Sequence, residues 1–245
     1  MYDSLAIIYD CFTDDIDYNR WADDIDGLLK TNSVFPIKNV VDLACGTGNI
    51  TSRLAKKGYN LIGIDISEEM LLRAGNNMRK SGVNYNLVKQ DISRFSVHKK
   101  MDAVLCMCDG VNYLTENSQI DGFFNCCKQA LKPNGLLIFD ISSEEKLRYI
   151  LGNNEYFDIR DDACFFWQNE INNNILSLEL NIFIREEDGR YIRKTESQKQ
   201  RIYKEAEIKE RLTDFEIINI ASVSYDNKGE DKRLQFICRL KEEKK

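Results

Sequence analysis

Apolar stretches rich in β-branched residues alternate with amphipathic stretches from about residue 38 to residue 142. The apolar stretches predict buried strands, and the periodicity of the amphipathic stretches predicts helices between them. This alternation is typical of repeated βα units around a parallel sheet. We expect strands at 39–42, 60–65, 85–90, 102–106 and 136–140, and helices at 49–57, 67–80 and 117–131.

The first 35 residues show a helical pattern with an aromatic component. Tyr18, Trp21, Ile25 and Leu28 recur at steps of three and four, which gives the helix one apolar face. Two interpretations stay open. The helix packs on the core, or its aromatic side chains cover a ligand cleft.

The pattern changes after about residue 153. Three β-rich stretches between Tyr156 and Tyr203 are separated by turn-like sequences at 172–174 and 187–190. They predict an antiparallel β insertion at 153–204, and its edge offers a place for another subunit to pair. A short helix at 205–212 and strands at 215–225 and 233–240 follow. Residues 1–152 and 205–245 are therefore expected to form one domain.

The composition is that of a globular protein. The chain has 245 residues, of which 43% are hydrophobic and 30% charged, and this length is enough for one large core. The net charge of −6 argues against a large phosphate-binding surface, so we expect no nucleic acid partner. The sequence shows neither a secretory leader nor an apolar run of membrane-spanning length. We therefore expect a cytoplasmic protein without a membrane partner.

The cysteines and the histidine point to no metal site. The 8 cysteines follow no repeated CxxC spacing, which favours free thiols in a reducing compartment. Cys106 and Cys108 lie two apart, but they have no second pair or nearby histidine, so we interpret them as buried thiols. The single histidine, His98, precedes the strand predicted at 102–106 and is expected in a surface loop.

A strand that runs into a glycine turn and then into a helix lies at residues 40–50. Gly46 and Gly48 let the backbone of such a turn approach a ligand closely. A dinucleotide fingerprint would have a third glycine at the position of Thr51, so pyrophosphate binding is disfavoured. A P-loop is excluded because no Gly-Lys-Ser/Thr sequence follows.

Acidic residues follow strand after strand along the predicted sheet. In an open α/β sheet, ligands bind outside the carboxyl ends of the strands. A single aspartate there often caps a helix or makes a turn. Five in succession instead favour a cationic ligand rich in hydroxyl and amino groups. They are Asp42, Asp65, Asp91, Asp109 and Asp140.

With these residues the chain resembles the class I S-adenosylmethionine-dependent methyltransferases. The similarity covers residues 38 to 142 in order, through the motifs at 42–48, 63–67, 90–92, 108–110 and 131–135. Ala44 stands where many relatives have the first glycine of the turn. The resemblance implies a Rossmann-like seven-stranded sheet flanked by helices, with an N-terminal helical cap at 1–35. The insertion is similar to that of the glycine and amino-sugar N-methyltransferases.

The resemblance also implies a role for residues at the strand ends. Asp65 would accept hydrogen bonds from both ribose hydroxyls of S-adenosylmethionine, because a carboxylate has two acceptor oxygens. Asp91 and the Ile92 backbone would bind adenine, which Ile66 and Met70 would sandwich. The backbone of the glycine turn would run beside the methionine part, and the Cys108 carbonyl would accept its ammonium. Tyr9 and Trp21 would close the site. The residues expected to bind the cofactor are Tyr9, Trp21, Asp42, Ala44, Cys45, Gly46, Gly48, Asp65, Ile66, Met70, Asp91, Ile92 and Cys108.

The expected activity is methyl transfer to a small molecule, at nitrogen. Methyl transfer from a sulfonium depends mainly on alignment and a dry site, so a neutral amine needs no dedicated base, whereas a hydroxyl usually does. Acceptor-side candidates are Tyr113, Asp109 and Tyr203, followed by Asp140, Glu196 and Arg201. Amino-sugar relatives often carry Glu-x-His-x-x-Arg in the insertion, and this chain has Gln198 at the histidine position.

Other interpretations of the sequence stay open. The same fold could act on tRNA or protein, or serve as a non-catalytic module that binds S-adenosylmethionine. An aromatic group in and after the insertion would suit a planar or partly apolar acceptor, but it could equally belong to the core. It consists of Phe165, Phe166, Trp167 and Tyr203.

Overall fold

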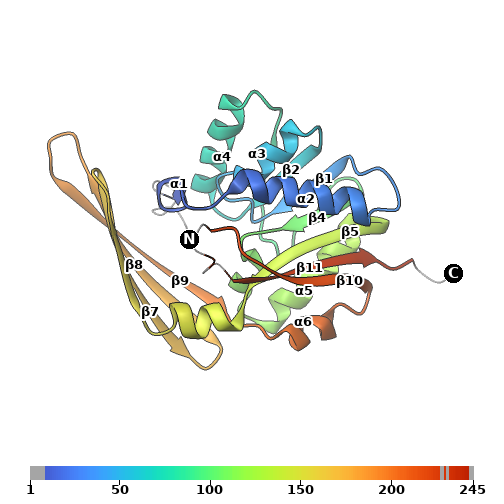
Figure 1. The fold of residues 1–245 in the computed structure, drawn as a ribbon. Coiled ribbons are helices and arrows are strands. Elements are labelled where there is room, and N and C mark those ends of the chain that lie inside the picture. Colours follow the sequence, from blue (N-terminus) through green and yellow to red (C-terminus); the bar gives the residue numbers. More distant parts are fainter. Residues whose placement is uncertain (1–8, 227–228, 230–231, 243–245) are drawn as a thin grey trace.

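Two β-sheets of different kinds make up the protein in this computed structural model, which describes residues 9–226, 229 and 232–242, without the side chains of residues 11 and 12 (Figure 1). The first eight residues of the expected cap lie outside the described residues. The larger sheet has the strand order β10-β11-β5-β4-β1-β2-β3. Its strands are β1 (Asn39–Leu43), β2 (Asn60–Asp65), β3 (Asn86–Lys89), β4 (Met101–Cys106), β5 (Leu131–Ser142), β10 (Phe215–Val223) and β11 (Arg233–Leu240).

The seven-stranded sheet is parallel except at one side. Strands β1 to β5 run parallel to their neighbours, whereas β11 is antiparallel to β5 and β10 is antiparallel to β11. The chain order of the sheet reverses between β1 and β4, and a ligand site is expected at the carboxyl ends beside this point. This is the predicted Rossmann-like sheet, and except for the start of β5 the observed strand bounds agree with the predicted ranges to within two residues.

Helices cover both faces of this sheet. One face packs against α2 (Tyr18–Asn32) and α3 (Asn49–Lys56). The other packs against α5 (Asn117–Ala130) and α6 (Glu205–Arg211). In the chain, α4 (Glu68–Lys80) connects β2 to β3. The N-terminal α1 is a short helix at Tyr9–Phe12. Of the described helices, none is long and apolar enough to cross a membrane.

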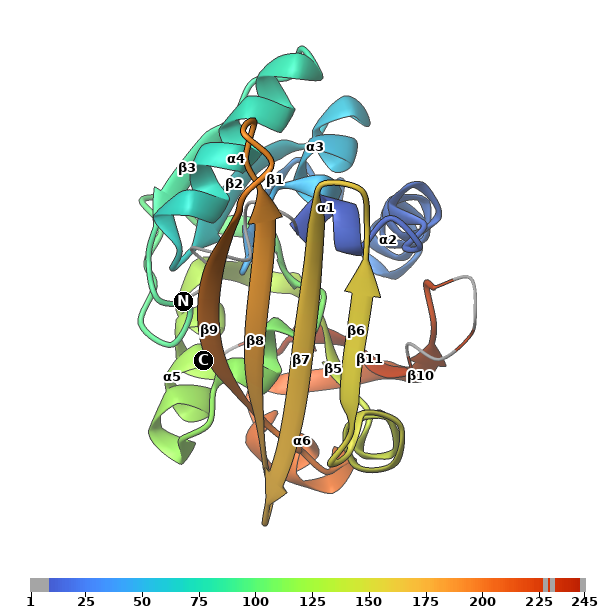
Figure 2. The same ribbon diagram turned by 90° about the vertical axis from the view of Figure 1, so that its left-hand side faces the viewer.

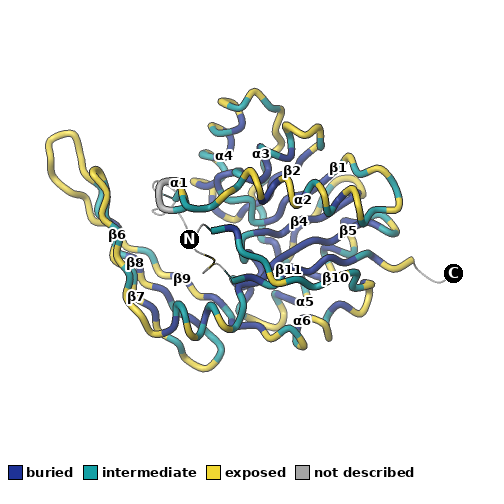
Figure 3. The backbone as a smooth tube through the Cα atoms, in the orientation of Figure 1, coloured by how far each residue is buried: buried dark blue, intermediate teal, exposed yellow. Residues whose placement is uncertain are grey.

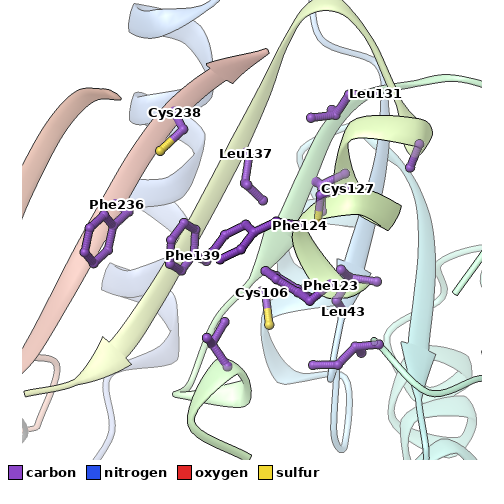
Figure 4. Packing of buried hydrophobic residues seen from close by; sticks show 14 of the residues in the cluster. Leu43, Cys106, Phe123, Phe124, Cys127, Leu131, Leu137, Phe139, Phe236 and Cys238 are labelled. Carbon is purple, nitrogen blue, oxygen red and sulfur yellow. The ribbon is translucent and has the colours of Figure 1, made fainter. Parts of the chain in front are cut away.

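The core on the α5 face is aromatic (Figure 4). Phe139 of β5 stacks on Phe236 of β11 with a centroid distance of 4.8 Å, and Phe124 of α5 meets Phe139 edge to face at 5.6 Å. All three are buried. Strands covered on both faces read as continuous apolar runs, which is why the sequence predicted them well.

The second sheet consists of β6 (Glu155–Ile159), β7 (Ala163–Asn172), β8 (Ile175–Arg185) and β9 (Tyr191–Arg201), each antiparallel to its neighbour. It stands in front of the main sheet in Figure 2, and no described helix covers the face turned to the viewer. Alternate residues of β8 are buried on the inner face, and they are Leu176, Leu178, Leu180 and Ile182. Figure 3 shows that the hairpin ends far from the main sheet are exposed.

Two local predictions were wrong. The first of the three predicted β stretches is split into β6 and β7 by residues 160–162, where the Arg160 N–H donates to the Ala163 carbonyl at 2.8 Å. A tight turn without glycine or proline left no signal in the sequence. The strand predicted at 136–140 begins earlier than expected, since β5 already starts at Leu131 and includes residues 131–135, which follow the helix α5 directly.

Candidate active site

A cavity of about 860 Å³ opens at the carboxyl ends of the central strands. Most of the residues predicted to bind the cofactor line it. These are Tyr9, Ala44, Gly46, Asp65, Ile66, Met70, Asp91, Ile92 and Cys108. We call it the first cavity. The sequence therefore predicted the composition of this wall, whose members come from five separate stretches of the chain.

Asp65 ends β2 with its carboxylate fixed by the backbone. One oxygen accepts the Gly46 N–H at 2.8 Å and the other accepts the Ser67 N–H at 2.9 Å. The residue is only 6% exposed. Burial raises the pKa of this carboxyl, and hydrogen bonds from the backbone of Ser67, Gly46 and Ile66 act in the opposite direction. An ionised carboxylate can accept about four hydrogen bonds, so acceptor capacity remains on both oxygens.

The glycine turn adopts the left-handed backbone conformation at three positions. The φ angles are +52° at Ala44, +54° at Gly46 and +76° at Gly48. A Cβ at Gly46 would meet no atom within 4 Å, so the backbone borders open space in the cavity. A Cβ at Gly48 would lie 3.1 Å from the Ala74 Cβ. Gly48 therefore lets α3 approach α4 and is not among the residues lining the first cavity.

Asp42 and Cys45 stand beside this wall and not in it. They line a smaller neighbouring cavity of about 350 Å³. The Asp42 carboxylate is 3% exposed and accepts a hydrogen bond from the Thr51 hydroxyl. Burial raises the pKa of Asp42 to about 7, and the nearby Asp65 adds to this effect.

The adenine end that the sequence predicts has polar and apolar walls. The Asp91 Oδ1 accepts from the Ser93 N–H at 2.9 Å and from its hydroxyl at 2.7 Å. Ile66 is 48% exposed, while Met70 is buried. The three predicted residues Asp91, Ile66 and Met70 lie in one cavity, and their chemistry suits a flat heterocycle with an amino group.

The helix α1 is tied across the glycine turn by Asp10. Its carboxylate accepts from the Thr47 hydroxyl at 2.7 Å, from Asn49 at 2.9 Å and from Asn77 at 3.3 Å. The neighbouring Tyr9 lines the first cavity, and burial raises the pKa of its hydroxyl. Sequence reasoning gave Asp10 no role, because its partners lie on α3, α4 and the turn.

Two predicted site residues belong to the core instead. Trp21 is 1% exposed and stacks on Tyr225 with a centroid distance of 4.2 Å. Tyr203 is 1% exposed and donates its hydroxyl to the Leu114 carbonyl. Neither residue lines the first cavity, so the prediction that Trp21 closes the site was wrong. The alternative, in which the Trp21 helix packs on the core, is the observed one.

A second cavity of about 920 Å³ lies between the main sheet and the inner face of the second sheet. It shares Tyr9, Cys108 and Tyr113 with the first cavity, so the two adjoin at these residues. The remaining lining residues are Thr13, Asp109, Lys146, Leu151, Phe165, Trp167, Leu178, Leu180, Gln198 and Gln200.

The predicted aromatic group is divided by the alternation of the strand. Phe165 and Trp167 of β7 line the second cavity, whereas Phe166 points to the other face and is 41% exposed. Successive side chains of a strand lie on opposite faces, which accounts for the division. Tyr203 follows the sheet and does not line the second cavity.

Gln198, at the position where amino-sugar relatives carry histidine, is part of a hydrogen-bonded chain. It donates to Glu196 at 2.8 Å and accepts from the Tyr113 hydroxyl at 3.2 Å. Because an ionised carboxylate only accepts, the amide nitrogen must face Glu196 and the amide oxygen must face Tyr113. Arg201 is turned toward Asn117 at 2.9 Å and toward Glu207 and is not among the lining residues.

Asp109 and Asp140 meet at a basic residue that the sequence analysis did not single out. Arg233 Nη1 lies 3.0 Å from the Asp109 Oδ1 and 3.2 Å from the Asp140 Oδ1. Asp140 is fully buried and does not line the second cavity, whereas Asp109 does. The signal in the sequence that could have pointed to Arg233 was its position at the start of a largely apolar predicted strand. His98, as predicted, lies exposed in a loop.

The sheet order, the helical layers and the cavity at the strand ends define a Rossmann-like class I methyltransferase. A methyltransferase domain matches residues 40–135. The chain belongs to the S-adenosylmethionine-dependent methyltransferases.

The similarity to individual proteins extends over nearly the whole chain. A putative methyltransferase of Geobacillus sp. (strain WCH70) is 30% identical to this chain over 229 residues. The aligned part covers 90% of this chain and 91% of that relative. A crystal structure of an S-adenosylmethionine-dependent methyltransferase from Clostridium acetobutylicum ATCC 824 is similar to this chain with a TM-score of 0.85 and 33% sequence identity. The match covers 98% of this chain and 99% of that protein. A sugar N-methyltransferase from Streptoalloteichus sp. ATCC 53650 shares the fold, with a TM-score of 0.78 and 15% sequence identity. The match covers 99% of this chain and 93% of that protein.

Proposed function

We propose that this enzyme transfers the methyl group of S-adenosylmethionine to a nitrogen of a small molecule bound in the second cavity. The observation that carries the proposal is that the two cavities adjoin at Tyr9, Cys108 and Tyr113. Ligands in the two cavities would meet there, as an in-line displacement requires. S-adenosylmethionine supplies a methyl group on a sulfonium. In this proposal the insertion at 153–204 is the acceptor-binding subdomain.

The first cavity fits the cofactor at each of its parts. Asp65 offers both carboxylate oxygens to a ribose diol, and Asp91 offers a carboxylate to the adenine amino group. Ile66 and Met70 are the apolar walls for the ring. The open space beside Gly46 accommodates the chain that joins ribose to the amino acid part.

The lining of the second cavity is mostly apolar or neutral, with Lys146 and the Arg233-paired Asp109 as its charged residues, and this supports a partly apolar acceptor. Phe165, Trp167, Leu178 and Leu180 form apolar walls, and the amides of Gln198 and Gln200 supply neutral hydrogen-bonding groups. A planar ring with one or two polar substituents would satisfy both kinds of wall.

The same lining favours nitrogen over a hydroxyl as the nucleophile. Asp109 is the carboxylate among the lining residues, and it is already paired with Arg233. The chain's one histidine, His98, lies exposed in a loop. A hydroxyl acceptor needs a base within hydrogen-bond reach, whereas an uncharged amine brings its own lone pair.

The test of the acceptor class uses matched pairs of compounds. Purified protein is incubated with S-adenosylmethionine and a panel of aryl and alkyl amines, each paired with the analogue that has a hydroxyl in place of the amine. Formation of S-adenosylhomocysteine and the methylated product is followed by mass spectrometry. We expect turnover of amines and none of their hydroxyl analogues. Turnover confined to the hydroxyl members would refute the nitrogen assignment.

Neighbouring residues on β7 provide a matched pair of variants. Trp167→Ala removes a wall of the second cavity, and we expect it to raise the KM for the acceptor about tenfold, a loss of about 1.4 kcal/mol. Phe166→Ala removes an aromatic ring from the opposite, exposed face and should leave the KM unchanged. Equal effects of the two substitutions would contradict the placement of the acceptor.

A further inference from the structure

We propose that Arg233 is a positioning residue that holds the turn formed by Cys108 and Asp109, the wall between the two cavities. The inference rests on the proposed function, because it assigns this turn to both the cofactor site and the acceptor site. Cys108 lines both cavities, and Asp109 lines the second. Arg233 itself lines neither of them and would act through its two carboxylate partners.

The turn has a backbone conformation that needs support. Cys108 has a φ of +59° and Asp109 a φ of +52°, so two successive residues other than glycine are left-handed. Such conformations are unfavourable for residues with a Cβ and persist where the surrounding structure enforces them. The shape of the wall between the cavities therefore depends on the groups that hold the turn.

Asp140 holds the backbone of this turn. Its Oδ2 accepts the Cys108 N–H at 3.1 Å, and its Oδ1 accepts the Asp109 N–H at 2.6 Å. Asp140 is fully buried on β5. Two successive N–H groups aimed at one carboxylate make a small anion-binding nest. Both bonds depend on the Asp140 carboxyl staying in place.

Arg233 offsets part of the negative charge that this arrangement buries. Its Nη1 bridges the Asp109 Oδ1 at 3.0 Å and the Asp140 Oδ1 at 3.2 Å, and its side chain is 8% exposed. Without the guanidinium, two carboxylates would face and repel each other in a buried site. The second oxygen of Asp109 accepts from Ser142 at 3.0 Å and from Gln200 at 3.3 Å. The network thus joins the turn to the second sheet.

The aromatic core explains why the cation is an arginine. The guanidinium carbon lies 5.2 Å from the centroid of Trp21, and Trp21 stacks on Tyr225. A flat guanidinium can stack on an indole ring and bond two carboxylates at once, whereas an ammonium can only pair as a point charge. Trp21 therefore contributes to the site by packing its ring against the Arg233 guanidinium, although it does not line the cofactor cavity.

Binding of S-adenosylhomocysteine to the full chain tests the inference. We expect Arg233→Gln to weaken binding at least tenfold in calorimetric titration. Arg233→Lys should weaken it less, about threefold, because the charge remains while the stacking on Trp21 and the bridge between the two carboxylates are lost. Arg239→Gln is the matched control, since Arg239 lies on the same strand and pairs with Glu216 at the surface at 3.0 Å. It should bind like the wild type.

A charge-balanced double variant separates positioning from a purely structural role. In Asp109→Asn/Arg233→Gln the network keeps the net charge of the wild type, so we expect tighter binding than in Arg233→Gln alone. Thermal unfolding of every variant is measured in parallel, and affinities are compared well below the lowest melting temperature. If Arg233→Gln does not fold, Arg233→Lys decides the question: the inference expects it to bind more weakly than the wild type, and wild-type affinity would overturn the inference.

The inference is overturned if folded Arg233→Gln binds like the wild type, or if the double variant binds more weakly than Arg233→Gln. The titration uses no acceptor, so an error in the proposed acceptor class would not affect it. A wild-type protein that does not bind S-adenosylhomocysteine would instead refute the proposed cofactor site, and that result is read before the variants are compared.

Discussion

Asp65 differs from an ordinary capping aspartate in what its carboxylate still offers. Both of its oxygens accept a backbone N–H, and the residue also lines the first cavity. Asp65→Ala should weaken S-adenosylmethionine binding about 100-fold, because two hydrogen bonds to a charged group contribute roughly 3 kcal/mol. Calorimetric titration checks this value.

Two further variants at this strand end act as controls. Asp65→Asn keeps one acceptor oxygen and should show an intermediate loss of affinity. Glu68→Gln lies three residues away with a side chain that is 71% exposed, and it should bind normally. An Asp65→Ala protein with wild-type affinity would remove Asp65 from the cofactor site.

Asp42 makes the stability of the fold depend on pH. Burial raises the pKa of its carboxyl from 3.8 to about 7. Between these two values the folded state binds more protons at this residue than the unfolded state, so its contribution to stability falls as the pH rises toward 7. Above about pH 7 this contribution is constant.

Asp42→Asn should remove this part of the pH dependence. Urea unfolding of the variant and the wild type at pH 4.5, 6 and 8 should show the variant gaining in relative stability up to about pH 7. The exposed Asp24 on α2 gives the control, Asp24→Asn, which should track the wild type at each pH. A difference between Asp42→Asn and wild type that does not change with pH would contradict the assignment.

The residues that sequence reasoning placed correctly share one property. Asp65, Asp91 and Gly46 belong to short motifs at strand ends, so the local sequence determines their position. Trp21 was misplaced because its partner Tyr225 lies about 200 residues further along the chain. Arg233 was missed for the same reason, since both of its carboxylate partners lie on other strands and turns.

At the scale of elements, the glycine turn and the turn after β4 are in close contact. A Cβ on Gly110 would lie 2.8 Å from the Ala44 Cβ and 3.0 Å from the Cys106 Sγ. Gly110→Ala should therefore destabilise the fold by about 1–3 kcal/mol through overpacking. Ala44→Gly replaces a left-handed residue that has a Cβ by glycine, so it should stabilise by about 0.5–1 kcal/mol.

The double variant Ala44→Gly/Gly110→Ala measures this contact directly. The cost of Gly110→Ala should be smaller in the Ala44→Gly background, with a coupling of about 1 kcal/mol in urea unfolding. Gly27→Ala in α2 is the control, because a Cβ there meets nothing within 4 Å. Strict additivity of the two substitutions would show that the loops tolerate the added methyl independently.

Strands and helices with a clear periodic pattern were predictable, and the short turns between them were not. Strand β2 was predicted at its observed bounds because its apolar run is bounded by polar residues. The strands β6 and β7 were predicted as one stretch, since the turn at residues 160–162 is an Arg-Asp-Asp sequence. The short helical turn at Gly110–Tyr113, which carries Tyr113 to both cavities, also lacked a periodic signal.

At the scale of the whole molecule, the two sheets differ in how they are covered. The main sheet has a core on each face, whereas the second sheet has one cluster on its inner face. Backbone amides covered on one face open at lower free energy than those covered on both. We therefore expect amide hydrogen exchange to be slowest in β1, β4 and β5 and faster in β6 and β9, the edges of the second sheet.

Addition of S-adenosylhomocysteine should slow amide hydrogen exchange in some elements and leave it unchanged in others. Exchange should slow at residues 44–48 and in α1, because Asp10 ties that helix to the glycine turn. It should not change in β6, which lies at the edge away from β9 and contributes no lining residue to either cavity. Protection that spread uniformly over both sheets would show that they respond as one unit. The predicted pattern would instead leave the second sheet free to adjust to the acceptor once the cofactor is in place.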